Sequence, residues 1–292
     1  MTAQIISALP VPFTTEGSIE WDSYDALLQR ISPHVHGALV AGTTGEFPAL
    51  DDDERLEAFR RACLVLGTER VIAHIGHPSP RQVVRLGKAA AALGITRMAT
   101  LSPYYLPADD AAVVEFFRGV TASLPGIDHY VYLFPERTGI TVSTGAFREI
   151  MALPGVRGTK LSGAATLDLV AYSAELQPGQ EVYSGDDSTL PQVLENGGTG
   201  VVSGVSAAFP ETFARLAAAL DTSPQKGEGI SDEAQSLQKT VVELVRLAGP
   251  SIIRLKEAVS VNVDGQWASR MPMPAIDDSL RSELHQAAAL NS

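Results

Sequence analysis

A lysine and a tyrosine at the ends of short apolar runs are the residues of this sequence best suited to covalent chemistry. Lys160 ends the run 155–160, and Tyr132 ends the run 130–132, which leads through Pro135 into a loop that carries Arg137. A lysine amine is a weak nucleophile at its reference pKa of about 10.4, and burial or a nearby cation is needed to lower that pKa. The end of a buried strand can supply such an environment. On these residues alone, a solvated lysine that merely ends a strand is the competing interpretation.

Further polar residues follow other apolar runs of the chain. They are Thr43, Thr44, Tyr105 and Asp186, and each has an ordinary explanation as a loop cap or a space-filling side chain. Together with the lysine, tyrosine and arginine they provide an amine that can add to a ketone and a phenol and hydroxyls that can move protons. They also provide a guanidinium that can bind a carboxylate in bidentate fashion. This set of groups indicates Schiff-base chemistry.

Other kinds of chemistry lack their sequence signals. His34 and His36 share one short segment, and the remaining histidines are scattered along the chain, so we expect no metal site. The chain contains no Gly-x-Ser-x-Gly motif, which disfavours a serine hydrolase.

The elements that must position these residues form a regular series. Helical segments of 10–20 residues separate compact apolar runs at residues 4–9, 37–41, 71–76, 97–101, around 132, 155–160, 181–184 and 200–203. Eight such units favour an α/β fold, a (β/α)8 TIM barrel, in which chemistry gathers at the carboxyl ends of the strands. An open doubly wound sheet is the alternative, but residues 9–12 offer no glycine-rich phosphate turn.

The chain continues beyond the predicted barrel, which we place at residues 1–222. A turn-like stretch at 224–229 precedes helical segments at 234–247, at 252–259 and from about Asp278. Each helix is short and lacks a core of its own. We therefore expect residues 223–292 to form a C-terminal helical extension packed on the barrel. The alternative is that these helices pack against another subunit.

Composition limits the partners and the location of the protein. Of its 292 residues, 34 are acidic and 22 are basic, and no stripe of Lys or Arg is present. A nucleic-acid partner is therefore not expected. No run reaches the roughly 18 apolar residues of a membrane span, and the amino terminus lacks a basic segment before an apolar one. We predict a cytoplasmic protein with no membrane partner.

An ordered set of short motifs resembles the dihydrodipicolinate synthase / N-acetylneuraminate lyase family. The motifs are Gly42-Thr43-Thr44-Gly45-Glu46, Pro103-Tyr104-Tyr105, Tyr132-x-x-Pro135-x-Arg137-Thr138-Gly139, Gly158-x-Lys160, Gly185-Asp186-Asp187 and Gly197-Gly198-x-Gly200-Val201-Val202-Ser203. They occur in family order. The resemblance implies a (β/α)8 barrel with a C-terminal helical extension, assembled as a homodimer or homotetramer. It also implies a class I lyase that uses a lysine imine and no other cofactor.

The resemblance further implies a role for each site residue. Lys160 is expected to form an imine with pyruvate or another 2-oxo acid, and Tyr132 to shuttle protons. The hydroxyl of Thr43 and the side chain of Tyr105 from a neighbouring subunit are expected to assist the tyrosine. The loop that contains Thr44 is expected to hold the pyruvate carboxylate.

The remaining positions bear on the second substrate. The resemblance implies that the Val202 carbonyl lines the pocket and that Arg137 binds the carboxylate of an aldehyde. We expect condensation of pyruvate with an aldehyde, as in 4-hydroxy-tetrahydrodipicolinate synthase. Cleavage or dehydration of a 2-keto-3-deoxy sugar acid or a 4-hydroxy-2-oxo acid is the nearest alternative, and a non-catalytic metabolite-binding barrel is the alternative of another class. Leu133, Leu161 and Val11 depart from the family pattern beside the site and put the aldehyde in question.

Overall fold

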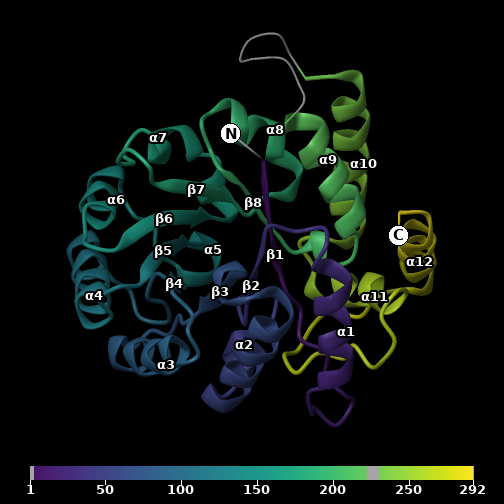
Figure 1. The fold of residues 1–292 in the computed structure, drawn as a ribbon, viewed down its shortest axis with the longest axis horizontal. Helices are drawn as coiled ribbons and strands as arrows, with labels where there is room; N and C mark the ends of the chain where they lie inside the picture. Colours follow the sequence, from purple (N-terminus) through teal and green to yellow (C-terminus); the bar gives the residue numbers. More distant parts are fainter. Residues whose placement is uncertain (1–2, 222–229, 292) are drawn as a thin grey trace.

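The computed structural model describes residues 3–221 and 230–291. Within these residues, eight parallel strands close into a barrel in chain order, with helices around the outside (Figure 1). The strands are β1 (Gln4–Ala8), β2 (Gly37–Val40), β3 (Val71–His74), β4 (Arg97–Leu101), β5 (Asp128–Leu133), β6 (Val156–Leu161), β7 (Glu181–Ser184) and β8 (Gly200–Ser203). The predicted (β/α)8 TIM barrel is confirmed.

The strands are mostly apolar because both of their faces are covered. Every residue of β2 and β3 is buried, as expected for a parallel sheet enclosed by crossover helices. The inward-facing side chains fill the barrel with a compact cluster, whose members are Ile6, Ala8, Leu39, Ile72, Ala99, Tyr130, Tyr183 and Val202. The outward-facing side chains belong to a larger core shared with the helices.

The helices that connect the strands differ widely in length. They are α1 (Trp21–Ile31), α2 (Asp52–Leu66), α3 (Pro80–Ala92), α4 (Asp110–Ser123), α5 (Pro135–Thr138), α6 (Thr144–Met151), α7 (Leu169–Ser173), α8 (Leu190–Glu195) and α9 (Pro210–Asp221). The short helix α5 begins directly after β5 and contains the Pro135–Thr138 part of the predicted arginine loop. The loop after β5 therefore has a defined helical turn rather than an irregular course.

The C-terminal part of the chain adds α10 (Asp232–Ala248), α11 (Ile252–Ser260) and α12 (Asp278–Leu290). These helices lie along one side of the barrel, where α10 packs against α9 and α11 packs against α12 (Figure 1). Leu237, Val241 and Leu244 of α10 are part of the same core as the outer face of the barrel. The stretch 224–229 and the boundary at residue 222 lie outside the described residues, so the domain division stays a prediction.

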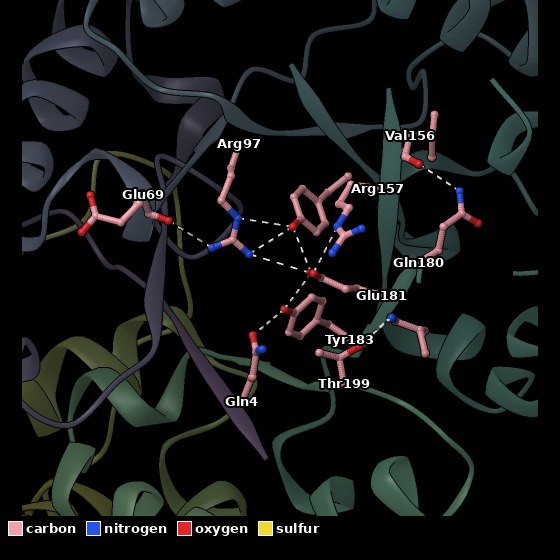
Figure 2. A network of polar contacts seen from close by, with 11 residues as sticks. Gln4, Glu69, Arg97, Val156, Arg157, Gln180, Glu181, Tyr183 and Thr199 are labelled. Carbon is pink, nitrogen blue, oxygen red and sulfur yellow. Dashed lines mark hydrogen bonds and ion pairs between the residues drawn. The ribbon is translucent and has the colours of Figure 1, made fainter. Parts of the chain in front are cut away.

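A network of polar side chains occupies the amino-terminal end of the barrel (Figure 2). Glu181 of β7 accepts hydrogen bonds at Oε2 from the hydroxyls of Tyr130 (2.9 Å) and Tyr183 (3.0 Å). Arg97 donates to the Tyr130 hydroxyl at 3.0 Å, and the Gln4 amide oxygen lies 2.7 Å from the Tyr183 hydroxyl. Burial raises the pKa of Tyr130 to about 12, so this phenol stays protonated. The polar groups at this end satisfy one another, and the predicted reactive groups lie at the opposite end.

Candidate active site

Lys160 and Tyr132 lie side by side at the carboxyl ends of adjacent strands. The register of β5 and β6 pairs the two residues directly, and the Lys160 nitrogen lies 4.1 Å from the centroid of the Tyr132 ring. Lys160 is 8% exposed and Tyr132 is 1% exposed. The structure therefore excludes the solvated lysine that was the competing interpretation of the sequence.

Gly158 accounts for the Gly-x-Lys spacing. Alternate residues of a strand share a face, so a side chain at position 158 would point into the barrel on the same face as Lys160. A Cβ atom there would lie 2.6 Å from the Glu181 carbonyl oxygen and 3.1 Å from the Tyr130 ring. The backbone of β6 can approach its neighbours this closely only because the residue is glycine.

Thr43 lies in the tight turn that follows β2. Its hydroxyl oxygen is 3.3 Å from the Tyr132 hydroxyl. This distance is short enough for the proton relay between the two hydroxyls that the sequence predicts. The Glu46 N–H donates to the Thr43 carbonyl at 3.0 Å. Ala41 and Glu46 bracket the turn with φ values of 52° and 56°, in the left-handed region. The backbone of this turn is thus held in a specific shape beside the tyrosine.

Thr44 and Val202 lie toward β8. Val202 pairs with Ile6 of β1, is 5% exposed, and contributes its side chain to the barrel interior. The Thr44 hydroxyl lies 3.6 Å from the place that a Cβ on Gly204 would occupy. The turn after β2 therefore reaches the end of β8, so Thr44 and Val202 lie on the same side of the barrel mouth.

Tyr105 and Arg137 are exposed rather than part of this cluster. Tyr105 is 89% exposed and has a φ of 79°. Arg137 lies on α5 with its guanidinium 5.6 Å from the Phe134 ring centroid. Its neighbour Glu136 accepts a hydrogen bond from the Ala164 N–H at 2.7 Å. The Glu136 carboxylate therefore contacts the loop after β6 rather than Arg137. Both predicted site residues are available for groups outside the chain.

His74 and Arg55 form a buried pair beneath the site that the sequence analysis missed. The Nδ1 atom of His74 lies 3.0 Å from the Ala41 carbonyl, and its ring centroid lies 6.1 Å from that of Tyr132. Arg55 donates to the His74 carbonyl. Burial, and then the cations Arg55 and Lys160, lower the pKa of His74 well below its usual value, so the imidazole is neutral at pH 7. Its position at the end of an apolar strand was the available signal.

Asp187, rather than the predicted Asp186, joins the ends of two strands of the barrel. Its Oδ2 atom accepts hydrogen bonds from the Ser203 hydroxyl (2.8 Å) and the Val205 N–H (3.1 Å). Asp186 instead accepts from the N–H of Ser188 at 3.0 Å, as a local cap. Burial raises the pKa of Asp187 to about 7, against the lowering effect of these hydrogen bonds and of the Lys160 charge.

The described residues give no donor set for a metal ion. Within residues 3–221 and 230–291, no group of three or more His, Cys, Asp or Glu side chains is placed to bind one. Across the same ranges, no helix has the length and apolar character that crossing a membrane requires.

Comparison with known proteins identifies the family. A family model described as the dihydrodipicolinate synthetase family matches residues 1–290. The 4-hydroxy-tetrahydrodipicolinate synthase of Synechococcus sp. (strain CC9605) is 30% identical over 292 residues, which cover 98% of this chain and 94% of the relative.

Solved structures share the same fold. A sialic acid aldolase from Ruminococcus gnavus, solved as a catalytic lysine mutant, superposes with a TM-score of 0.88 at 21% identity over 99% of this chain and 96% of its own. YagE, a prophage protein of the dihydrodipicolinic acid synthase family from E. coli K12 solved with pyruvate, gives a TM-score of 0.87 at 22% identity. That alignment covers 99% of this chain and 98% of the other.

The fold and the family match agree on the class of protein. The closed α/β barrel carries a buried lysine, Lys160, at the carboxyl end of a strand. The chain belongs to the dihydrodipicolinate synthetase family, and it is a class I lyase.

The titration of Asp187 predicts a pH-dependent stability. Its pKa of about 7 in the folded state lies above the ordinary value of 3.8, so between these values the folded state binds more protons and stability falls as pH rises. Asp187→Asn keeps an oxygen that can accept from Ser203 and Val205 but cannot titrate. At about 1.36 kcal/mol per pKa unit, the wild type should lose up to about 4 kcal/mol of unfolding free energy relative to this variant over that range.

Urea denaturation of both proteins at a series of pH values measures this difference. Asp168→Asn, at an exposed position, is the matched control and should follow the wild type. A constant difference between wild type and Asp187→Asn at all pH values would show that the carboxyl group is ionised throughout.

Proposed function

We propose that Lys160 forms an imine with the keto carbon of pyruvate or another 2-oxo acid. The observation that carries this proposal is the buried Lys160 amine 4.1 Å from the ring centroid of Tyr132, whose hydroxyl lies 3.3 Å from Thr43. Attack of the amine on the ketone carbon gives a carbinolamine, and loss of its hydroxyl as water leaves an iminium. Each step moves a proton, which a positioned phenol can accept and return.

The iminium then acts as an electron sink. Loss of a proton from the methyl carbon gives an enamine, and that carbon forms a bond to the aldehyde carbon while the aldehyde oxygen takes up a proton. Hydrolysis of the resulting iminium frees the product and restores the Lys160 amine. The same steps in reverse cleave an aldol.

The names of related proteins support this assignment. The Synechococcus relative is named as a 4-hydroxy-tetrahydrodipicolinate synthase. The E. coli protein was solved with pyruvate, and the Ruminococcus gnavus aldolase is described by its catalytic lysine. A lysine and pyruvate are thus associated with the same barrel in related proteins.

The carboxylate of pyruvate is assigned to the turn after β2. The Thr44 hydroxyl and the backbone N–H groups of Thr43 and Thr44 can donate to an anion there, and the Val202 carbonyl is assigned to the same side of the barrel mouth. Arg137 is assigned to the carboxylate of the aldehyde, because its exposed guanidinium has no ion pair within the described residues and lies just after β5.

A neighbouring subunit is assigned to complete the site. Tyr105 is 89% exposed and follows a residue pair, Pro103-Tyr104, at the end of β4. An exposed phenol on a backbone held at positive φ is suited to insertion into the site of a second copy, in a homodimer or homotetramer.

We assign the enzyme to the cytoplasm.

Condensation with an aldehyde that carries a carboxylate is the favoured reaction, because Arg137 supplies a cation for it. Cleavage or dehydration of a 2-keto-3-deoxy sugar acid or a 4-hydroxy-2-oxo acid is the second candidate. The sialic acid aldolase that shares the fold supports this candidate by its name, since the steps above, run in reverse, cleave an aldol.

Borohydride reduction in the presence of pyruvate tests the imine. Intact mass should show one reduced pyruvate on the wild type and none on Lys160→Ala, because only an imine is reduced to a stable secondary amine. Lys88→Ala removes an exposed lysine of α3 and should keep the adduct. A wild-type protein without an adduct would support the non-catalytic metabolite-binding barrel instead.

Removal of the Tyr132 hydroxyl tests the proton relay. Tyr132→Phe should lower kcat by about 10²–10⁴-fold with the fold intact, as loss of a general acid–base group does. Tyr24→Phe is the matched control, because the Tyr24 hydroxyl is buried with no hydrogen-bond partner among the described residues. Steady-state kinetics and circular dichroism measure the two effects, and wild-type turnover in Tyr132→Phe would remove this tyrosine from the mechanism.

Arg137→Ala tests the choice of aldehyde. A charge-assisted hydrogen bond contributes about 1.5–3 kcal/mol, so the KM for aspartate semialdehyde should rise by roughly 10–100-fold. The pyruvate adduct should be unchanged. Arg118→Ala, which removes an exposed arginine of α4, is the control. Background turnover of the wild type with the semialdehyde, together with cleavage of a 2-keto-3-deoxy sugar acid, would favour the second candidate reaction.

A further inference from the structure

A fully buried ion pair joins the C-terminal helices to the turn after β2. The Lys256 nitrogen lies 2.5 Å from Oε1 of Glu46, and both side chains are 0% exposed. The other carboxylate oxygen of Glu46 accepts a hydrogen bond from the Met271 N–H at 2.8 Å. Each oxygen of this carboxylate therefore contacts the C-terminal part of the chain.

Lys256 lies on α11, and its ammonium group has further contacts besides Glu46. It donates to the Ala268 carbonyl at 2.7 Å, and its nitrogen lies 4.5 Å from the centroid of the Phe13 ring. Burial lowers the pKa of Lys256 to about 8, while the Glu46 carboxylate acts in the opposite direction. Its amine is therefore mostly protonated at pH 7 and can pair with the carboxylate.

Stability alone does not account for a pair of this kind. Removing two charges from water costs as much as their attraction returns, so apolar side chains of similar volume usually stabilise a core equally well. A buried pair does provide a fixed geometry, because each charge must meet its partner. Glu46 is also the residue that closes the turn, with its N–H bonded to the Thr43 carbonyl at 3.0 Å and its φ at 56°.

We propose that Lys256 is a positioning residue that holds the Thr43–Thr44 turn in register with Tyr132 and Lys160 through Glu46. The C-terminal extension thereby takes part in binding the 2-oxo acid without touching it. Displacement of Glu46 would move the Thr43 carbonyl and hydroxyl, and with them the 3.3 Å contact to the Tyr132 hydroxyl. The proposal rests on the assignment of Lys160 and of the turn in the proposed function.

The double variant Glu46→Gln/Lys256→Met separates positioning from stability, because it leaves no unpaired buried charge. We expect it to unfold at a temperature near that of the wild type and to form the borohydride-trapped adduct at saturating pyruvate. Its KM for pyruvate should rise at least tenfold, with a lower kcat. Wild-type KM and kcat in this variant would overturn the proposal.

The single variant Glu46→Gln keeps the proposal testable should the double variant fail to fold. Its amide nitrogen would face either the Lys256 ammonium or the Met271 N–H, so we expect the turn to shift and the KM for pyruvate to rise at least threefold. An unchanged KM in Glu46→Gln would overturn the proposal on its own.

A matched control and the wild type complete the experiment. Arg30→Met/Glu211→Gln removes a partly exposed ion pair that joins α1 to α9 and should keep the wild-type KM. Absence of a pyruvate adduct in the wild type would overturn the proposed function and this inference together. A normal wild-type adduct with unchanged kinetics in the Glu46 and Lys256 variants would overturn this inference alone.

Discussion

The parallel register between β5 and β6 is the constraint on which the site depends. It places Tyr132 opposite Lys160 and continues to Tyr183 on β7. Because side chains alternate along a strand, a slip of one residue in β6 would turn the Lys160 amine toward the helices. Gly158 helps to prevent this, since the space beside it is filled by the Tyr130 ring and the Glu181 backbone. The chemistry at one end of the barrel thus depends on packing nearer the other.

The two ends of the barrel differ in how their charged side chains are partnered. At the amino-terminal end, Arg97 and Glu181 are linked through tyrosine hydroxyls, so the network is closed (Figure 2). At the other end, in the part of the chain described, the Lys160 amine lies over an aromatic ring with no ion pair. His74, neutral beneath it, adds no further charge. A closed network stabilises the barrel, whereas an amine that forms no ion pair can react with an incoming carbonyl.

Much of the fold could be predicted from the sequence, because each strand of a parallel barrel corresponds to a short apolar run between helical segments. The Thr43 turn, Tyr132 and Lys160 could be placed because each follows or ends such a run. The Glu46–Lys256 pair could not, since its members are 210 positions apart and lie in elements that no local pattern connects. Asp187 was missed for a related reason: only the closure of β7 on β8 shows which of two adjacent aspartates points inward.

Two of the three departures from the family pattern near the site bear less on the substrate than their positions in the sequence suggested. Leu133 and Leu161 are 3% and 0% exposed and belong to the core shared with the helices, on the opposite strand face from Tyr132 and Lys160. Their side chains therefore change how the barrel packs against its helices rather than what enters its mouth. In the proposed function, selection of the second substrate is assigned instead to exposed residues of the loops, above all Arg137. Motifs carried by buried strands consequently define the imine chemistry more firmly than they define the aldehyde.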